Sequence, residues 1–272
     1  MPELPEVQTI VSDLQPILIG MRFEVIDGTH ANSIAGAIDN ESKIREKKVV
    51  AVERRGKFIN IVFENSYVMT IHLRMSGRLL FRSLDDEPLK FERTRINFDK
   101  GSLRFCDMRK FGKVWISSEQ DYEEVTGISR LGVEPLDGQF TLDKFRELFA
   151  GRKGVIKKWL LDQSLIAGIG NIYADEACFY AGVRPDALVE RLGDSELKKL
   201  HSSVLMALKQ GVRNRGTSVS DYADAFGKTG RNQELLYVYG RGGQKCLRCE
   251  SILEKIRLAG RGTVFCNNCQ KA

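Results

Sequence analysis

Four cysteines near the C-terminus constrain the fold of this chain more than any other feature of its sequence. They form two CxxC pairs, Cys246 with Cys249 and Cys266 with Cys269, and the segment between the pairs, 250–265, has the length of a β-hairpin. Two such pairs supply the four thiolates of a tetrahedral Zn²⁺ site and leave no coordination position open for water. Disulfides are the alternative, but they are rare in reducing compartments. The spacing predicts one structural zinc ion, whose binding folds a small C-terminal module.

The positive charge of the chain is concentrated in the same region. The whole chain has 272 residues and a formal net charge of +6 at pH 7. The segment from Lys228 onward contains nine Lys and Arg residues and three Asp and Glu residues. The difference of six equals the net positive charge of the entire chain. A basic terminal module indicates a polyanionic partner, with nucleic acid as the first choice. An ordinary solvated basic surface is the alternative.

Pro2 is the candidate nucleophile. The sequence begins MPELPE, so removal of Met1 would leave the amine of Pro2 as the N-terminus. An α-amino group titrates near pH 8, roughly two units below lysine, and its lone pair can attack carbon to form a Schiff base. Glu3 and Glu6 place two carboxylates near that amine, where one could transfer protons. From these residues alone, a helix that simply starts at Pro2 and Pro5 is an equal alternative.

Length and composition are typical of a globular protein with one large domain or two ordinary ones. Hydrophobic residues make up 42% of the chain, which is enough for buried cores. The N-terminus is acidic where a signal peptide is basic, and no apolar run approaches the roughly 20 residues that span a bilayer. We therefore expect a cytoplasmic protein. Cys106 and Cys178 stand alone among apolar residues and are expected in the core.

The periodicity of apolar residues changes once along the chain. An amphipathic helix comes first and is expected to end near Pro16. Runs rich in β-branched and aromatic residues follow, which predicts a β-sandwich or barrel over roughly the first 130 residues. After a break at 131–135, three helices are predicted around 142–149, 155–160 and 197–208. The predicted strands are 22–27, 48–54, 57–63, 67–73, 94–98, 102–106 and 113–116.

A glycine-rich turn at 164–171 precedes a further predicted helix near Ile172. Backbone amides at such a helix start suit a phosphate group. The Gly-Ile-Gly spacing is not a dinucleotide-binding fingerprint, and a tight turn without a ligand is the alternative that these residues favour by themselves.

Seven short motifs follow one another along the chain: MPELPEV at the start, RRGKF at 54–58, HLRMSG at 72–77, DMRKFG at 107–112, GIGNIY at 168–173, ELLYVYG at 234–240, and GRGT at 260–263 between the two CxxC pairs. In this order they resemble the motifs of the bacterial formamidopyrimidine-DNA glycosylases, within the formamidopyrimidine glycosylase and endonuclease VIII family. The resemblance extends from one end of the chain to the other.

The resemblance implies an α+β multidomain fold with DNA in a cleft between domains. The implied parts are an N-terminal catalytic β-sandwich flanked by helices (1–131), a linker (132–140), a helix-two-turn-helix domain with a lesion-capping loop (141–237) and a C-terminal β-hairpin zinc finger (238–272). A monomer is expected.

The implied activity is that of a bifunctional glycosylase and abasic-site lyase acting on oxidised purines in duplex DNA. Pro2 would attack the sugar of a flipped nucleotide and expel the base, with Glu3 as the acid and base. Lys57 resembles the lysine that assists β-elimination. Arg261 resembles the arginine linked to δ-elimination and to phosphate contact. Without the resemblance, both would be taken for surface charges.

The resemblance also implies a set of DNA contacts. Met75 would fill the space left by the flipped nucleotide, Phe111 would wedge beside the opposite base, and Arg109 would hydrogen-bond the unpaired cytosine. Phosphate contacts position a strand without reading its sequence. Further expected DNA contacts are Asn171, Glu6, His72, Arg152, Lys157 and Phe91.

Phe91 marks the clearest departure from the family pattern. It stands in a Lys-Phe-Glu-Arg segment where many members carry Lys-His-Asp-His, so Arg93 is expected to replace a lost histidine contact. Two other functions stay open. One is a glycosylase of the sister class that prefers oxidised pyrimidines, whose start more often reads PEGP. The other is a binder of damaged DNA without catalytic activity.

Overall fold

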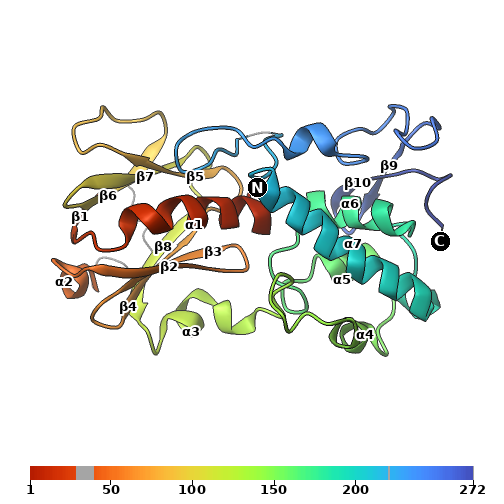
Figure 1. Ribbon diagram of the computed structural model, residues 1–272, viewed down its shortest axis with the longest axis horizontal. Coiled ribbons are helices and arrows are strands. Elements are labelled where there is room, and N and C mark those ends of the chain that lie inside the picture. The colour runs from red at the N-terminus through yellow and green to blue at the C-terminus, as the bar shows by residue number, and fades with distance from the viewer. Residues whose placement is uncertain (29–39, 220, 272) are drawn as a thin grey trace. The chain divides into compact units, whose positions relative to one another are not determined.

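The computed structural model describes residues 1–28, 40–219 and 221–271 (Figure 1). The chain forms two compact units. Unit 1 consists of Met1–Arg130 and Asn214–Gln233, and unit 2 of Leu131–Arg213 and Glu234–Ala272. The chain therefore leaves unit 1, returns to it for one short segment and leaves it again.

Unit 1 contains two four-stranded antiparallel sheets and the long helix α1 (Leu4–Leu18). The first sheet has the strand order β1-β6-β7-β5 and the second has the order β2-β3-β4-β8. The described part of unit 1 also contains two short helices, α2 (Glu41–Ile44) and α3 (Tyr122–Thr126), and a 3₁₀ turn at Ile128–Arg130. The strands are β1 (Phe23–Gly28), β2 (Val49–Arg55), β3 (Phe58–Phe63), β4 (Tyr67–His72), β5 (Gly77–Arg82), β6 (Glu92–Phe98), β7 (Gly101–Asp107) and β8 (Lys113–Ser118).

One hydrophobic core joins the two sheets and the helix, as a β-sandwich requires. The ring of Phe23 in β1 meets Phe98 of its own sheet and Phe63 of the opposite sheet, each at 6.1 Å between ring centroids. Val7, Ile10 and Leu14 of α1 are buried in the same core. Their spacing of three to four residues places them on one face of α1, which contacts β2 and β3 (Figure 1).

The structure of unit 1 differs from the sequence predictions in two places. Helix α1 continues through Pro16 to Leu18. Pro16 is exposed in the last turn, where the carbonyl that loses its partner can bond water. Strand β5 (Gly77–Arg82) was not predicted at all. It is an edge strand in which three consecutive apolar residues stand between two arginines, so its pattern does not alternate.

Unit 2 is helical with one β-hairpin. The side chain of Thr141 caps α4 (Leu142–Phe149) by accepting a hydrogen bond from the Lys144 amide at 3.2 Å. Phe179 of α6 packs with Val238, Leu253 and Val264, so the C-terminal module shares a core with this helix. The other elements are α5 (Ile156–Leu160), α6 (Asn171–Ala181), α7 (Asp194–Arg213), β9 (Glu254–Leu258), β10 (Arg261–Phe265) and 3₁₀ turns at Val189–Arg191 and Asn232–Leu235.

The segment Asn214–Gln233 belongs to unit 1 by its contacts. The expected lesion-capping loop, 217–233, lies within this segment, whereas the domain boundaries expected from the sequence include it in 141–237. Ion pairs hold the segment to α1: the partly exposed guanidinium of Arg215 bridges the buried carboxylates of Asp13 in α1 at 2.7 Å and Asp224 at 2.5 Å.

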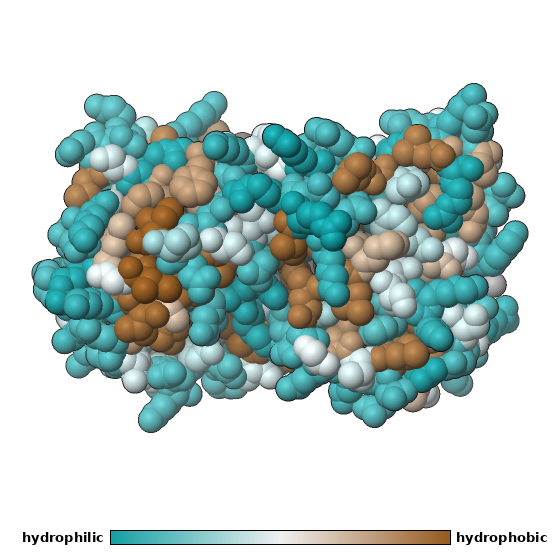
Figure 2. Space-filling view, viewed as in Figure 1, coloured by the Kyte–Doolittle hydropathy of each residue, from teal (hydrophilic) through white to brown (hydrophobic). Residues whose placement is uncertain are grey.

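Hydrophilic side chains cover most of the face seen in Figure 2, and the hydrophobic residues on it form separate patches. Within the described ranges, no helix is both long and apolar enough to cross a membrane.

Candidate catalytic and DNA-binding residues

The N-terminus of α1 holds Pro2, Glu3 and Glu6 in the interior of unit 1. Pro2 is buried, and Glu3 and Glu6 are only 3% and 1% exposed. Glu3 is the N-cap of α1 and forms a capping box with Glu6, whose Oε2 accepts a hydrogen bond from the Glu3 amide at 2.8 Å. Pro5 lies in the first turn, whereas Pro2 precedes the cap. A helix start and a positioned Pro2 are therefore compatible.

The second carboxylate oxygen of Glu6 holds the returning segment. Its Oε1 accepts a hydrogen bond from the Thr217 amide at 2.7 Å. Glu6 thus joins the residue that follows Pro2 to the start of the 217–233 loop. In this structure, its carboxylate serves contacts within the protein rather than a surface for DNA.

Lys57 lies at the tip of the β2–β3 hairpin. Arg55 pairs with Phe58, so Gly56 and Lys57 form a two-residue turn. Gly56 has a φ of 55°, which a type II′ turn requires at its first position. Arg54 Nε donates to Gln8 Oε1 of α1 at 2.8 Å, so the hairpin is bonded to the helix that begins just after Pro2 and Glu3. Lys57 is 8% exposed. The two-residue turn and the hydrogen bond from Arg54 to α1 fix the position of its backbone.

His72 ends β4 and is a neutral, mostly buried imidazole. It pairs with Phe58 across the sheet, and the two rings meet edge to face at 4.5 Å. Its Nδ1 accepts a hydrogen bond from the Arg74 amide at 3.0 Å, which leaves Nε2 as the donor. Burial, and then the positive charges of Arg74 and Lys57, lower the pKa of His72 to about 3. A phosphate contact by His72 would be that of a neutral donor.

The three residues expected to open the duplex lie on two adjoining loops. Gly77 at the start of β5 pairs with Asp107 at the end of β7, so the turn before β5 meets the loop after β7. Met75 on the first loop is 42% exposed, and Phe111 on the second is 50% exposed. The guanidinium of Arg109 lies 5.1 Å from the centre of the Phe111 ring. The structure thus brings these three side chains to one edge of the sheet.

Asp107 is a residue that sequence reasoning missed. It is buried beneath these loops and accepts hydrogen bonds from three of their backbone amides. Its place at the head of the DMRKFG motif was visible, but an acidic residue at a strand end is normally exposed.

Two cations lie near the ring of Phe91. Its ring is 5.1 Å from Lys90 Nζ and 5.9 Å from the guanidinium of Arg93. Arg93 Nε also donates to the Asp107 carbonyl at 2.8 Å. At the position where the sequence departs from the family pattern, the structure therefore has an aromatic ring with two cations near it.

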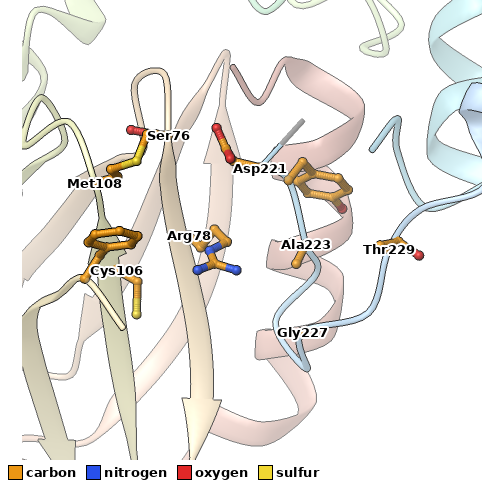
Figure 3. Close-up of a pocket in the computed structure, with 10 residues that line it drawn as sticks. Ser76, Arg78, Cys106, Met108, Asp221, Ala223, Gly227 and Thr229 are labelled. Carbon is orange, nitrogen blue, oxygen red and sulfur yellow. The ribbon is translucent and has the colours of Figure 1, made fainter. Parts of the chain in front are cut away.

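Strands β5 and β7 and the segment 221–229 enclose a pocket of about 270 Å³ (Figure 3). Polar groups from Ser76, Arg78 and Asp221 line it together with the sulfurs of Cys106 and Met108. Burial raises the pKa of the Cys106 thiol to about 11, so this cysteine is an uncharged part of the wall. The other lining residues are Phe91, Tyr222, Ala223, Gly227 and Thr229.

In unit 2, Asn171 and the β9–β10 hairpin lie together. Asn171 is the first residue of α6, and its Nδ2 donates to the Gly262 carbonyl at 2.9 Å. Its Oδ1 is buried and has no hydrogen-bond partner among the described residues. Arg261 follows the two-residue turn of Ala259 and Gly260 and is exposed. The side-chain amide of Asn171 therefore lies beside the backbone of Gly262, the residue that follows Arg261.

Lys157 contacts the β9–β10 hairpin at Gly262 and Thr263. It is 1% exposed, and its ammonium contacts Asp175 Oδ1 at 2.5 Å, Thr263 Oγ1 at 2.7 Å and the Gly262 carbonyl at 3.3 Å. Burial raises the pKa of Asp175 to about 7 although Lys157 opposes the shift. We had expected Lys157 to contact a DNA phosphate. Its burial gives it a structural task instead, which is to hold the backbone beside Arg261.

Arg152 follows α4 and is partly exposed. Its guanidinium lies 4.8 Å from the Trp159 ring, and its Nε donates to the Leu148 carbonyl at 2.6 Å. A contact of Arg152 with a DNA phosphate stays a prediction.

The four expected metal ligands come together in unit 2. Every Sγ of Cys246, Cys249, Cys266 and Cys269 lies within 4.8 Å of the others. Two of the separations are 3.9 Å and 3.5 Å. Tetrahedral Zn²⁺ with Zn–S bonds of about 2.3 Å separates its sulfurs by about 3.8 Å. The donor set and its spacing therefore fit one structural zinc ion.

Comparison with protein families covers nearly the whole chain. Residues 1–114 match the formamidopyrimidine-DNA glycosylase N-terminal domain, and residues 131–223 match the formamidopyrimidine-DNA glycosylase H2TH domain. Residues 243–272 match a zinc finger found in FPG and IleRS. A formamidopyrimidine-DNA glycosylase of Desulfitobacterium hafniense is 39% identical over 272 residues, which cover 99% of this chain and 100% of the relative. One of Moorella thermoacetica is 42% identical over 94% of this chain and 95% of the relative.

Solved structures agree with these matches. The complex between Lactococcus lactis Fpg and DNA containing an abasic site has a TM-score of 0.92 and 33% identity, over 99% of this chain and 100% of that one. Wild-type Lactococcus lactis Fpg with DNA containing N7-benzyl-Fapy-dG has the same TM-score and identity over 100% of both chains. The sandwich, the helical domain and the four-cysteine module thus recur in full and in the same order, and the chain belongs to the formamidopyrimidine-DNA glycosylase family.

Proposed function

We propose that this protein is a bifunctional DNA glycosylase and abasic-site lyase of base excision repair, which removes oxidised purines such as 8-oxoguanine and formamidopyrimidines from duplex DNA. One observation carries the proposal: Pro2 lies directly before the capped, buried start of α1, in a chain that matches the family over its full length. Bacterial relatives and a DNA substrate also suggest a cytoplasmic enzyme that works as a monomer at the nucleoid.

The chemistry begins with the amine of Pro2, once Met1 has been removed. A base within the stack cannot be reached, so the nucleotide is flipped out at a cost of a few kcal/mol. The Pro2 nitrogen attacks C1′ of its sugar, and the bond from C1′ to the base breaks. The base leaves with the proton that the Pro2 amine gives up, while Glu3 protonates the ring oxygen so that its bond to C1′ breaks and the sugar opens. The product is an iminium that joins Pro2 to C1′.

The iminium is an electron sink, which makes the proton at C2′ acidic. Loss of that proton expels the 3′ phosphate, and a second elimination expels the 5′ phosphate, leaving a one-nucleotide gap. Lys57 assists the first elimination and Arg261 the second. Zinc takes no part in these steps, since four thiolates fill its coordination shell.

The flipped base enters the pocket lined by Ser76, Arg78 and Asp221. The pocket is formed in part by the segment that Glu6 holds through Thr217, so the α1 cap supports both the nucleophile and the wall of the pocket. Met75, Arg109 and Phe111 occupy the space left in the duplex. Asn171, Arg152 and Arg261 contact phosphates, and Phe91 with its flanking cations contacts DNA at the pocket wall.

Borohydride trapping tests this proposal, because it converts the iminium into a stable adduct. Duplexes containing 8-oxoguanine opposite cytosine, thymine glycol, or no lesion are compared. An adduct with the first duplex is expected. Trapping with thymine glycol alone would support the oxidised-pyrimidine class instead. Tight binding to damaged duplexes without any adduct would support a non-catalytic binder.

A matched pair of variants tests the nucleophile. Pro2→Gly should lower base removal by about a hundredfold or more while lesion binding persists, because it replaces the nucleophile and leaves the DNA contacts intact. Pro5→Ala removes the proline of the first turn and should trap like the wild type. Full activity of correctly processed Pro2→Gly protein would refute the assignment.

A further inference from the structure

Asp107 ends β7 directly beneath the two loops that carry Met75, Arg109 and Phe111. It is 1% exposed. Its Oδ1 accepts hydrogen bonds from Ser76 Oγ at 2.6 Å and from the Arg109 amide at 3.1 Å. Its Oδ2 accepts hydrogen bonds from the amides of Phe111 at 2.9 Å and Gly112 at 2.8 Å. A carboxylate has about four acceptor positions, so these donors use its full capacity.

The same contacts join the two loops to each other. Ser76 belongs to the turn before β5, whereas Arg109 follows β7. The Ser76 hydroxyl donates to Asp107, and its oxygen also accepts from the Arg109 amide at 3.2 Å. Ser76 and Asp107 therefore connect the turn that carries Met75 to the loop that carries Arg109 and Phe111.

The exposed side chains cannot order these loops by themselves. Met75 is 42% and Phe111 50% exposed, so each has lost only part of its contact with water. Both loops also contain strained backbone: Arg74 has a φ of 54° and Lys110 a φ of 60°, in the left-handed region. A buried anchor must hold such loops, and Asp107 supplies it.

We propose that Asp107 is the positioning residue of the duplex-opening side chains. Its carboxylate holds Met75, Arg109 and Phe111 in one preformed arrangement, so that they enter the base stack without first being ordered. Preformed loops avoid the entropy cost of ordering on binding. This inference rests on the proposed function, and it assigns Asp107 to DNA opening rather than to the chemistry at the sugar.

Asp107→Asn in the full-length, zinc-loaded protein tests the proposal. Asparagine keeps the size but replaces one acceptor oxygen with a donor nitrogen, so two of the four hydrogen bonds are lost. Excision of 8-oxoguanine from duplex DNA should fall roughly 10- to 100-fold. Elimination at an abasic site in single-stranded DNA needs no opening of a stack, and it should stay within about twofold of the wild type.

A fluorescence measurement reports the opening step directly. A duplex carries 2-aminopurine beside a stable abasic analogue, and binding of the wild-type protein should raise the fluorescence as neighbouring bases unstack. Asp107→Asn should give little rise at saturating protein. Asp27→Asn is the control, because Asp27 is an exposed carboxylate of the same sheet and asparagine can still accept the hydrogen bond from Asn97.

If Asp107→Asn does not fold, Ser76→Ala decides the question. It removes the hydroxyl that links the two loops and should reduce the fluorescence rise; the abasic analogue has no base that could contact Ser76 in the pocket. An unchanged rise would overturn the proposal. So would a folded Asp107→Asn variant with wild-type excision, or one that loses both reactions equally. A wild-type protein that neither traps nor excises would refute the proposed function instead.

Discussion

Single buried carboxylates position much of the candidate site. Besides Asp107, Glu176 of α6 accepts hydrogen bonds from the amides of Tyr237, Val238 and Tyr239, each at 2.9 Å. These contacts order the chain that leads into the C-terminal module. Burial raises the pKa of Glu176, and the three hydrogen bonds oppose that shift. Each of these carboxylates is shielded from water and bonded to several backbone amides. Removal of the carboxylate alone, or of the amides alone, would leave a buried polar group without a partner and lower the stability of the protein.

His72 gives a prediction at the same scale. Because its pKa is about 3 in the folded protein and near 6.5 when unfolded, the unfolded chain takes up its proton first as the pH falls. The stability that the protein gains from a neutral, buried His72 is therefore fully present above pH 6.5 and is lost progressively as the pH falls toward 3. Relative to His72→Gln, the wild type should lose about 1.4 kcal/mol of unfolding free energy per pH unit below 6.5. Urea unfolding of both proteins at several pH values measures the difference, and parallel curves would contradict the assignment.

At the scale of elements, both units present a cation from a tight hairpin. Gly56 and Lys57 form the turn between β2 and β3, and Ala259 and Gly260 form the turn just before Arg261. Ala259 has a φ of 47° and Gly260 a φ of 75°, as a type I′ turn requires. Two-residue turns leave the chain little freedom, so each cation is held by backbone geometry.

The second hairpin depends on the ion pair between Lys157 and Asp175. The pKa of Asp175 rises from 3.8 to about 7 on folding, so its ionisation lowers stability as the pH increases through that range. The positive charge of Lys157 stabilises the ionised Asp175 and so reduces this loss of stability. Lys157→Met should therefore cost about 3 kcal/mol of unfolding free energy near pH 8.5 and clearly less near pH 5.5, where Asp175 is protonated.

Lys158→Met is the matched control, since Lys158 is exposed on the same helix and should change stability by less than about 0.5 kcal/mol. Chemical denaturation at the two pH values distinguishes the variants. An equal loss for Lys157→Met at both pH values would mean that its packing, rather than its charge, supports the hairpin.

At the scale of the whole molecule, the two units have separate cores, and zinc contributes to only one of them. Cys246 and Cys266 belong to the core around Phe179, whereas the core of unit 1 contains none of the four ligands. Loss of the metal should therefore unfold the C-terminal module and leave the sandwich intact.

Chelation of zinc, or Cys249→Ser, tests this separation. Duplex binding should weaken by at least about tenfold, because Arg261 and the basic module lose their fixed positions. Near-ultraviolet circular dichroism follows unfolding, and filter binding follows affinity. Cys178→Ala, a cysteine of α6 outside the two pairs, should retain zinc and affinity. Unchanged affinity after complete removal of zinc would show that the module is dispensable.

Much of this architecture was predictable because it depends on local patterns. The cysteine spacing, the apolar period of α1 and the Thr141 cap each act within a few residues, and the motifs carried the family resemblance. The contacts of Asp107 and Lys157 depend on residues that are distant in sequence, such as Ser76 and Thr263. Their burial could not be read from the chain, since charged residues are normally exposed. The roles of the individual site residues stay predictions.

The return of Asn214–Gln233 to unit 1 has a consequence for the order of synthesis. The ion pair between Arg215 and Asp13 spans 202 residues of sequence. While the chain grows on a ribosome, the sandwich must wait for the entire helical stretch before it receives this segment, with Tyr222 and Ala225 of its core. A nascent chain arrested before residue 214 would thus expose an unfinished apolar surface, and the N-terminal unit is the one that needs protection from aggregation during translation.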